Sequence, residues 1–360
     1  MSAFGGRYRG RRVLVTGHTG FKGSWLCAWL DELGAEVTGF ALPPEHDHNA
    51  LHWDQLGLDL DDRRGDLRDA GTMAALLQQT RPDIVFHLAA QALVRPSYKQ
   101  PLETWSSNVL GSANLLEACR QTDSVRAIVV ATTDKVYANR EWPWGYRETD
   151  TLAGHDPYSA SKAACELLCD SYRRSFWLAG ADAPLLATAR AGNVIGGGDW
   201  AEDRLVPDLA RAMQAGQPLQ IRAPQATRPW QHVLDCLSGY LQLGQRLLDG
   251  DAGCAEAWNF APPADTACSV AQLLDGMRRH WPELDWHDAG GNGPHEAGLL
   301  ALDSAKARAR LGWAPAWSLA DTLAATADWY RTQLAGLPTP TRAQIHGYRA
   351  AAAARGLSWA

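Results

Sequence analysis

Tyr158 and Lys162 stand four positions apart in the run Tyr-Ser-Ala-Ser-Lys. Positions i and i+4 of a helix project from the same face, so the lysine ammonium can lie beside the phenol. A free tyrosine has a pKa of about 10 and is a poor base near neutral pH, but an adjacent cation favours its phenolate form. The pair is therefore a candidate for abstracting a proton, although a Tyr and a Lys at this spacing are also common by chance.

A hydroxyl and two charged groups lie about one helix earlier in the chain. Residues 126–131 form an apolar run that predicts a buried strand, and Thr132 to Lys135 follow it directly. At the end of that strand the hydroxyl of Thr133 can join the phenol, with the charged residues Asp134 and Lys135 beside it. Two structural alternatives stand beside this interpretation: Asp134 caps the loop after the strand, and Lys135 forms a surface ion pair.

A glycine-rich turn lies in the first predicted strand–helix unit. Val13 to Thr16 predict a short strand, and a helix with apolar residues on one face follows the turn. The turn itself reads Gly17-His18-Thr19-Gly20-Phe21-Lys22-Gly23. Such a turn places backbone N–H groups and a helix N-terminus against a pyrophosphate. We therefore expect a dinucleotide site here, with a tight turn of chance glycines as the structural alternative.

The elements that must position these groups alternate along the chain. Residues 36–42 and 83–88 predict further strands, and helical stretches lie between the strands. This alternation predicts an α/β fold with a doubly wound, Rossmann-like parallel sheet. We expect a dinucleotide-binding domain of residues 1–190 plus about 233–262, and a smaller mixed α/β lobe of residues 191–232 plus 263–360. In that lobe, residues 203–215 predict a helix, and residues 350–354 predict either a surface helix or a frayed tail.

The composition is that of an ordinary globular protein. Of 360 residues, 21% are charged and 46% hydrophobic, which excludes disordered and collagen-like classes. The net charge of -6 lacks the basic excess of a nucleic-acid or anionic-membrane binder. No stretch approaches the roughly 20 apolar residues that span a bilayer, and the N-terminus lacks the apolar core of an export signal. We expect no nucleic-acid partner, no membrane association and no export.

Cysteine and histidine usage gives no sign of a metal or of disulfides. The seven cysteines are odd in number and lack paired short spacings, which argues against a disulfide framework or a zinc ribbon and fits a reducing cytoplasm. His46, His48 and His52 lie in a polar stretch after two prolines, without convincing ligand spacing. We expect a solvated loop there and no metal site.

The order of the motifs resembles the extended branch of the short-chain dehydrogenase/reductase superfamily. The resemblance rests on the spacing G-x-x-G-x-x-G followed by a hydroxyl, a Tyr and a Lys. It implies a catalytic triad of Thr133, Tyr158 and Lys162, and cofactor contacts from Gly17, Thr19, Gly20, Phe21, Lys22, Gly23, Asp66, Leu67, Leu88, Ala89, Ala90, Tyr158 and Lys162. The cofactor it implies is NAD. The second strand ends without the usual ribose-binding acid, which leaves NAD against NADP open, and Asp66 has an alternative role as a cap for the helix near Asp69.

Within that superfamily, Asp134-Lys135 occupies the place where nucleotide-sugar 4,6-dehydratases carry an acid and a base, in most of them Asp-Glu. This pair and the stretches 18–25, 91–95, 139–148 and 190–200 are similar to the CDP-glucose 4,6-dehydratase family, over most of the chain to about Trp313. The resemblance implies a lyase that converts CDP-D-glucose to CDP-4-keto-6-deoxy-D-glucose and water. Two rival hypotheses are a nucleotide-sugar 4-epimerase, which needs no such acid/base pair, and a dinucleotide-sensing protein, which commonly lacks the Tyr/Lys pair.

The mechanism implied by the resemblance is redox-neutral. Tyr158 takes the proton of the C4 hydroxyl while the C4 hydride passes to NAD, and the hydride returns to C6 after elimination across C5 and C6. Asp134 protonates the leaving C6 hydroxyl, and Lys135 takes the position of the base that removes the C5 proton. This role requires a neutral amine, which burial of Lys135 and a nearby charge such as Lys162 would favour.

Polar groups later in the chain are expected to bind the nucleotide sugar. The candidates are Gln91, Asn193, Arg204, Leu205, Arg228 and His232. By resemblance Arg228 meets the pyrophosphate, and Asn193 and the residues around Leu205 line the nucleotide. The resemblance also implies a homodimer or homotetramer that forms through the helices around residues 101–120 and 158–179.

Overall fold

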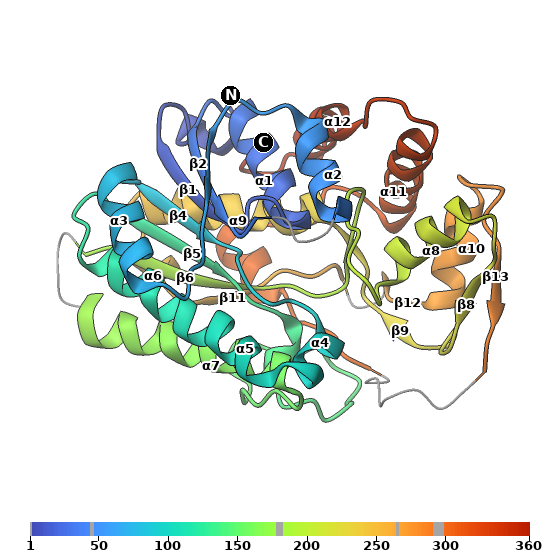
Figure 1. Ribbon diagram of the computed structural model, residues 1–360, viewed down its shortest axis with the longest axis horizontal. Coiled ribbons are helices and arrows are strands. Elements are labelled where there is room, and N and C mark those ends of the chain that lie inside the picture. The colour runs from blue at the N-terminus through green and yellow to red at the C-terminus, as the bar shows by residue number, and fades with distance from the viewer. Residues whose placement is uncertain (1, 44–46, 178–182, 264–265, 291–298) are drawn as a thin grey trace.

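A computed structural model describes residues 2–43, 47–177, 183–263, 266–290 and 299–360 (Figure 1). Its centre is a seven-stranded sheet in the order β11-β6-β5-β4-β1-β2-β3, and every pair of neighbouring strands is parallel. The strands are β1 (Arg12–Thr16), β2 (Glu36–Ala41), β3 (Asp61–Arg64), β4 (Ile84–His87), β5 (Ala127–Ala131), β6 (Leu185–Arg190) and β11 (Ala257–Asn259). The predicted α/β doubly wound fold is confirmed.

Alternate residues of the buried strands point to opposite faces of the sheet, and helices cover both faces (Figure 1). Val13 and Val15 of β1 pack into one core with α1 (Phe21–Glu32), α9 (Val233–Leu248) and α12 (Thr341–Ala354). Leu14 of the same strand packs into a second core with α3 (Ala70–Thr80), α6 (Gly111–Arg120) and α7 (Pro157–Tyr172). Because both faces are buried, the strands read as continuous apolar runs, which is how the sequence reveals them.

The order of the strands places the functional edge. From β1 the chain runs outward to β2 and β3, and it then crosses to the other side of β1 to form β4, β5 and β6. In open α/β sheets the crevice at this reversal, outside the carboxyl ends of the strands, is where ligands bind. The glycine turn follows β1, residues 88–91 follow β4 and Thr133 follows β5, so all three meet at this edge.

Shorter elements build the second lobe. Three two-stranded sheets pair β10 (Gln231–His232) with β7 (Val194–Ile195), β12 (Cys268–Ser269) with β9 (Thr227–Arg228), and β13 (Trp286–Asp288) with β8 (Leu219–Ile221). They are joined by α8 (Leu205–Gln214), α10 (Val270–Arg278) and α11 (Leu319–Leu334). The remaining helices of the described residues are α2 (Asp47–Leu56), α4 (Val94–Lys99) and α5 (Pro101–Trp105), with short 3-10 segments at Ala3–Gly6, Asp134–Val136 and Ala252–Cys254 and π-helical segments at Ser106–Leu110, Arg173–Trp177 and Ala307–Leu311.

The last helix is docked rather than frayed. Residues 350–354 end α12, whose Ile345, Tyr348 and Ala352 are buried. Beyond it, the ring of Trp359 stacks on that of Phe4 with the centroids 4.9 Å apart. The alternative of a frayed tail is therefore wrong, because this apolar face is covered by α1 and by the first residues of the chain.

The polar stretch around His52 is not a solvated loop. Residues 47–56 form α2, and the side chain of His52 is fully buried. Its Nδ1 lies 2.8 Å from Ser24 Oγ and its Nε2 lies 3.0 Å from Thr341 Oγ1. The expectation of a loop fails because both partners lie far away in the sequence, where local polarity gives no hint of them. His46 lies outside the described residues. Of the described part of the chain, no helix is both long and apolar enough to cross a bilayer.

Candidate active site

The glycine turn forms a tight cradle at the N-terminus of α1. Gly17 has a φ of 74°, and a Cβ atom there would lie 2.7 Å from the backbone nitrogen of Ala89. A Cβ atom on Gly23 would lie 2.0 Å from the carbonyl oxygen of Gly17. Only glycine permits this approach of helix, turn and neighbouring segment. The residues present therefore fit a dinucleotide pyrophosphate, for which an open backbone at a helix N-terminus is required.

A carboxylate reaches the same edge from a strand that the motif does not include. The side chain of His18 in the turn is buried, and its Nε2 lies 3.0 Å from Asp62 Oδ1 of β3. Its ring meets the ring of Trp53 edge-on at 4.6 Å, and a Cβ atom on Gly39 would lie 2.4 Å from it. Sequence reasoning looked for an acid at the end of β2 and missed Asp62, because pairing of β2 with β3 has no local signature.

The predicted adenine side lies next to the turn between β3 and α3. The carboxylate of Asp66 pairs with Arg68, which lowers the pKa of Asp66. Asp69 rather than Asp66 caps α3, since its Oδ1 accepts the backbone N–H groups of Gly71 and Thr72, so the alternative role for Asp66 is wrong. The side chain of Leu67 is buried in the core against Gly111.

Tyr158, Thr133 and Lys162 come together where β5 meets α7. The Tyr158 side chain is buried, and burial raises the pKa of the phenol to about 12, while its hydrogen bond with Thr133 and the charge of Arg204 act in the opposite direction. Burial has the opposite effect on the amine of Lys162 and lowers its pKa. Lys162 Nζ donates to the Ala131 carbonyl oxygen at 3.0 Å. The Thr133 hydroxyl thus meets the Tyr158 phenol after β5, and the Lys162 side chain is held by the last residue of the same strand.

Asp134 is the second titratable group of the site. Its side chain is buried, and burial raises the pKa of its carboxyl group, against the charges of Lys135, Arg228 and Lys22 and a hydrogen bond from Thr133 at 2.9 Å. A Cβ atom on Gly192 would lie 1.9 Å from Asp134 Oδ2, so glycine is needed for the carboxyl group to fit. A carboxyl group held in this way keeps its proton to a higher pH than an exposed one, which suits an acid.

Lys135 is placed differently from the expectation. It follows Asp134 at the site, but its side chain is exposed. The burial that was expected to favour its neutral amine is therefore absent, because the 3-10 turn Asp134–Val136 directs Asp134 and Val136 inward and leaves the residue between them outside.

Arginines of the second lobe bring positive charge close to Tyr158 and Asp134. Arg204 Nη1 lies 2.9 Å from Asp199 Oδ2, and the charge of Arg204 opposes the rise that burial causes in the pKa of Tyr158. The charge of Arg228 in β9 opposes the rise in the pKa of Asp134 in the same way. Asn193, with a φ of 51°, places its Nδ2 3.5 Å from Asp134 Oδ2. Leu205 begins α8 directly after Arg204.

Two residues predicted to contact the substrate form hydrogen bonds within the chain. The side chain of His232 is fully buried, where its Nδ1 accepts the backbone N–H of Leu234 at the start of α9 and its ring packs against Trp25 and Trp317. The amide of Gln91 is occupied in its own segment, by Leu93 and by Thr104 Oγ1 at 3.0 Å. In both residues a polar atom closes a local turn or helix end, and the two substrate contacts stay predictions.

Asn108 is a site residue that sequence reasoning missed. It lies in the π-helical segment Ser106–Leu110, which interrupts the helix expected over residues 101–120. Its Nδ2 donates to the carbonyl oxygen of Gln91 at 2.9 Å and to Ser161 Oγ at 2.8 Å, between Tyr158 and Lys162 on α7. The only signal for it in the sequence is a polar residue inside a helical stretch that the structure buries.

Sequence reasoning also missed a buried ion pair next to the end of β5. Arg190 Nε lies 2.9 Å from Glu166 Oε1, and both side chains are buried. Glu166 also accepts the hydroxyls of Thr132 at 2.5 Å and Thr188 at 2.6 Å. These bonds connect Glu166 of α7 to Arg190 and Thr188 of β6 and to Thr132, the residue before Thr133.

The doubly wound sheet, the glycine cradle and the Thr133–Tyr158–Lys162 cluster define an enzyme of the short-chain dehydrogenase/reductase type. The chain belongs to the GDP-mannose 4,6 dehydratase family, whose model matches residues 14–326. It is 46% identical over 333 residues to the CDP-glucose 4,6-dehydratase of Salmonella typhimurium, with 91% of this chain and 93% of that protein covered.

Solved structures give the same picture of the fold. The dTDP-glucose 4,6-dehydratase of Streptomyces venezuelae, solved with NAD and TYD bound, superposes with a TM-score of 0.75 at 26% identity, covering 91% of this chain and 98% of that one. The UDP-glucose 4-epimerase of Thermus thermophilus, in complex with NAD, gives 0.76 at 27% identity, with 89% and 99% covered. Members with different outcomes at the sugar thus share this fold, so the residues of the site must separate the activities.

Proposed function

We propose that this protein is an NAD-dependent dehydratase that converts CDP-D-glucose to CDP-4-keto-6-deoxy-D-glucose and water. The observation that carries the proposal is Asp134, a buried carboxyl group with a raised pKa, next to the hydroxyl that hydrogen-bonds Tyr158. Loss of water from C6 requires an acid at this place, whereas 4-epimerisation does not. The similarity to the Salmonella enzyme supports the choice of CDP-glucose.

The cofactor site is assigned to residues at the edge of the sheet. Gly17, Thr19, Gly20, Phe21, Lys22 and Gly23 would hold the pyrophosphate, Asp66 and Leu67 the adenine, and Leu88, Ala89, Ala90, Tyr158 and Lys162 the nicotinamide riboside. NAD bound there supplies the acceptor and later the donor of the hydride. The fit of the glycine cradle and the NAD held by the structural relatives support this assignment.

Three side chains of the site carry out the four proton transfers of the reaction. Tyr158 as phenolate removes the proton from the C4 hydroxyl, and the carbonyl that forms acidifies the C5–H bond. Lys135 is assigned the base that removes the C5 proton, and its exposure means that bound substrate must cover it for the neutral amine to be favoured. Asp134 then protonates the C6 hydroxyl as it leaves, and the proton held by Lys135 returns to C5 when C6 receives the hydride.

Charged and polar groups of the second lobe are assigned to the nucleotide sugar. Arg204 and Arg228 bring the charge that a diphosphate needs, and Asn193 and Leu205 lie beside them. We further propose that residues 191–232 with 263–360 form this substrate domain, and that residues 1–190 with about 233–262 form the dinucleotide-binding domain. The return of α9 and β11 to the main sheet supports the division, while α12 lies against α1 of the first domain.

An apolar surface supports a homo-oligomer. Large apolar side chains are exposed along α4, α5, the segment Ser106–Leu110 and α7, which lie side by side (Figure 1). These side chains are Tyr98, Leu102, Trp105, Leu110 and Leu167, with Phe176 just beyond α7. We propose a homodimer or homotetramer formed through this surface. We place the protein in the cytoplasm, where its seven free cysteines stay reduced.

The test is turnover of sugar nucleotides. Purified protein is incubated with NAD and, separately, CDP-glucose, dTDP-glucose, UDP-glucose and GDP-mannose, and the product is followed by loss of water in mass spectra and by the alkali-induced absorbance of the 4-keto sugar. Dehydration of CDP-glucose well ahead of the others is expected. Interconversion of epimers without loss of water, or NAD binding without any turnover, would contradict the proposal and favour the epimerase or the sensor.

A further inference from the structure

A line of hydrogen bonds crosses the buried end of the sheet beneath the cofactor edge. Thr16 at the end of β1 places its Oγ1 2.7 Å from His87 Nδ1 at the end of β4. On the other side of the imidazole, His87 Nε2 lies 2.9 Å from Ser112 Oγ of α6. Ser112 Oγ in turn donates to the carbonyl oxygen of Asn108 at 2.7 Å. The side chains of Thr16, His87 and Ser112 are buried, so water does not compete for these bonds.

The chemistry of the partners fixes the direction of every bond in this line. The Asn108 carbonyl can only accept, so the Ser112 proton points to it and the Ser112 oxygen accepts from His87 Nε2–H. His87 Nδ1 then accepts the hydroxyl proton of Thr16, whose oxygen accepts the backbone N–H of Ala89 at 3.3 Å. Burial, and next the charge of Lys162, lower the pKa of His87 to about 3, so the ring stays neutral, as this pattern requires.

Both ends of the line hold the same stretch of backbone, residues 88–91. Thr16 holds Ala89, and the Asn108 amide holds Gln91 twice, accepting its N–H at 2.8 Å and donating to its carbonyl oxygen at 2.9 Å. The glycine turn packs tightly against this stretch, since a Cβ atom on Gly17 would lie 2.7 Å from the nitrogen of Ala89. Asn108 also donates to Ser161 of α7, so the line connects the stretch to the helix that carries Tyr158.

We infer that His87 is a positioning residue for the cofactor. Through Thr16 on one side, and through Ser112 and Asn108 on the other, it fixes the position of residues 88–91 relative to the glycine turn and α7. The inference rests on the proposed function, in which this stretch holds the nicotinamide riboside. His87 touches neither cofactor nor sugar in this arrangement. Its loss should therefore weaken NAD binding and hydride transfer without changing affinity for the nucleotide sugar.

The variants separate the two sides of the imidazole. His87→Asn places an amide oxygen where Nδ1 accepts from Thr16, His87→Gln places an amide N–H where Nε2 donates to Ser112, and His87→Phe makes neither bond. Ser112→Ala breaks the line one step further on. The matched control is Ser238→Ala in α9, which removes an equally buried helical serine that donates to the Asp235 carbonyl oxygen at 2.7 Å and accepts from Trp313 Nε1 at 3.0 Å, outside the active site.

The measurements are the Kd of NAD by calorimetry, the Kd of CDP-glucose, the melting temperature, and the isotope effect with sugar deuterated at C4. His87→Phe is expected to weaken NAD binding about tenfold, which corresponds to about 1.4 kcal/mol, since both buried bonds of the imidazole are lost. The variants His87→Asn, His87→Gln and Ser112→Ala should have Kd values for NAD between those of His87→Phe and the wild type. All four should keep the Kd of CDP-glucose within about twofold and show a larger isotope effect, because hydride transfer becomes slower.

The control decides whether the role is positional. Ser238→Ala should lose stability comparable with Ser112→Ala while leaving the Kd of NAD unchanged. If the variants of His87 and Ser112 also keep wild-type NAD affinity and isotope effect, they act on stability alone and the inference is overturned. Should His87→Phe not fold, the two amide variants and Ser112→Ala carry the same test. A wild type that binds NAD but dehydrates no sugar nucleotide contradicts the proposed function and leaves the NAD comparison intact.

Discussion

The two sides of the site are built from different materials. The cofactor side, residues 17–23 and 88–91, consists of glycines and backbone in contact, held by buried neutral side chains. The proposed sugar side consists of partly exposed arginines: Arg95 pairs with Asp203, Arg204 pairs with Asp199, and Arg228 donates to the Thr227 carbonyl oxygen. In the proposed site, one side recognises its ligand by the shape of its backbone, and the other by the charge of its side chains.

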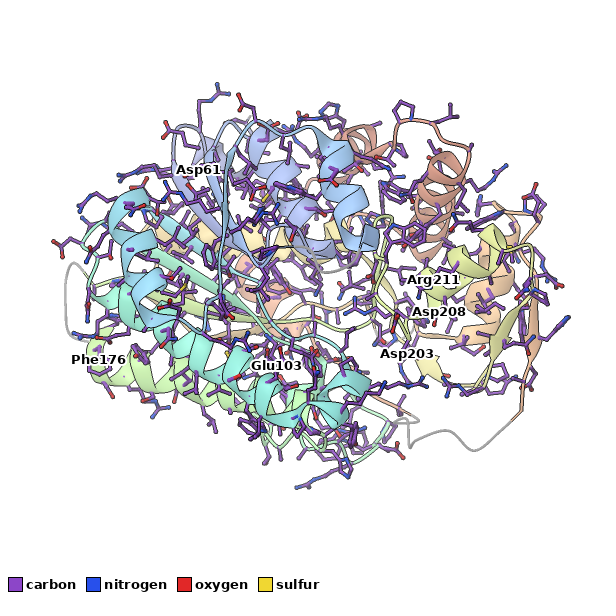
Figure 2. The ribbon with its side chains drawn as sticks, viewed as in Figure 1. Asp61, Glu103, Phe176, Asp203, Asp208 and Arg211 are labelled. Carbon is purple, nitrogen blue, oxygen red and sulfur yellow. The ribbon has the colours of Figure 1, made fainter. Side chains whose placement is uncertain are left out.

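The ion pair between Arg95 and Asp203 marks the sugar side most clearly. Arg95 belongs to α4 and Asp203 to the loop before α8, and the pair joins the two lobes beside Arg204. Asp203 lies at the edge of the second lobe that faces α4, near Asp208 and Arg211 of α8 (Figure 2). Such pairs rearrange at small cost, whereas the glycine cradle cannot. The difference suggests that substitutions will be tolerated unequally on the two sides.

The largest expected effect lies at the junction of the two sides. Tyr158→Phe removes the phenol but keeps the ring, so we expect kcat to fall by about three to four orders of magnitude. The Kd of NAD and that of CDP-glucose should each stay within about twofold, because neither side of the site loses its own contacts. Stopped-flow absorbance of the reduced cofactor measures the step directly. A drop of less than tenfold would place the base elsewhere.

The cofactor side should reject a single methyl group. Gly23 in α1 and Gly347 in α12 are both helical, but a Cβ atom would lie 2.0 Å from a carbonyl oxygen at the first and within 4 Å of nothing at the second. Gly23→Ala should cost about 3 kcal/mol of unfolding free energy and abolish NAD binding. Gly347→Ala should instead gain about 0.5 kcal/mol through helix propensity. Urea unfolding and NAD titration of both variants check this, and equal behaviour would refute the rigid cradle.

Asp134 lies between the two sides, and its effect should depend on pH. We expect Asp134→Asn to lower kcat about a hundredfold, as loss of a general acid does. Burial raises the pKa of Asp134. The active form is the protonated one, so wild-type kcat should fall as the pH rises through this raised value, and the variant should lack that fall. A pH profile of both proteins tests it, and an unchanged alkaline limb in the variant would remove Asp134 as the acid.

The smallest effect is expected at the ion pair between the lobes. In a double-mutant cycle with Arg95→Ala and Asp203→Ala, the coupling should stay below about 1 kcal/mol, since both side chains are partly exposed. KM for CDP-glucose should change no more than about threefold, and less at high salt, while the Kd of NAD is unaffected. A coupling of several kcal/mol, independent of salt, would show that the sugar side is as rigid as the cofactor side.

The same contrast explains what the sequence predicts. The strand, turn and helix of the cofactor side follow one another within residues 12–32, so local patterns suffice to place them. The meeting of Thr133 with Tyr158 was predictable as well, because Thr133 follows the buried strand β5 and Tyr158 stands in the first turn of α7. The exposure of Lys135 was not, since a one-residue difference in a 3-10 turn decides which side chain faces inward.

Features that depend on distant partners escaped prediction. His52 follows the polar residues 45–49 in the sequence, and its hydrogen bonds with Ser24 and Thr341 make its burial favourable. His232 looked like a ligand because it is polar and follows Arg228, but its ring is packed against aromatic side chains from other segments. In both cases tertiary packing overrides what the neighbouring residues suggest.

The contact between Phe4 and Trp359 has a consequence for synthesis. The backbone N–H of Phe4 donates to the carbonyl oxygen of Trp359 at 2.6 Å, and the two rings stack. Trp29 of α1 packs against the rings of Trp359 and of Tyr348 from α12. On the ribosome, the glycine turn and its helix therefore emerge long before the residues that cover the helix exist. The nascent chain therefore carries an uncovered aromatic face while the residues between α1 and α12 are synthesised, and chaperones have access to this face during that time.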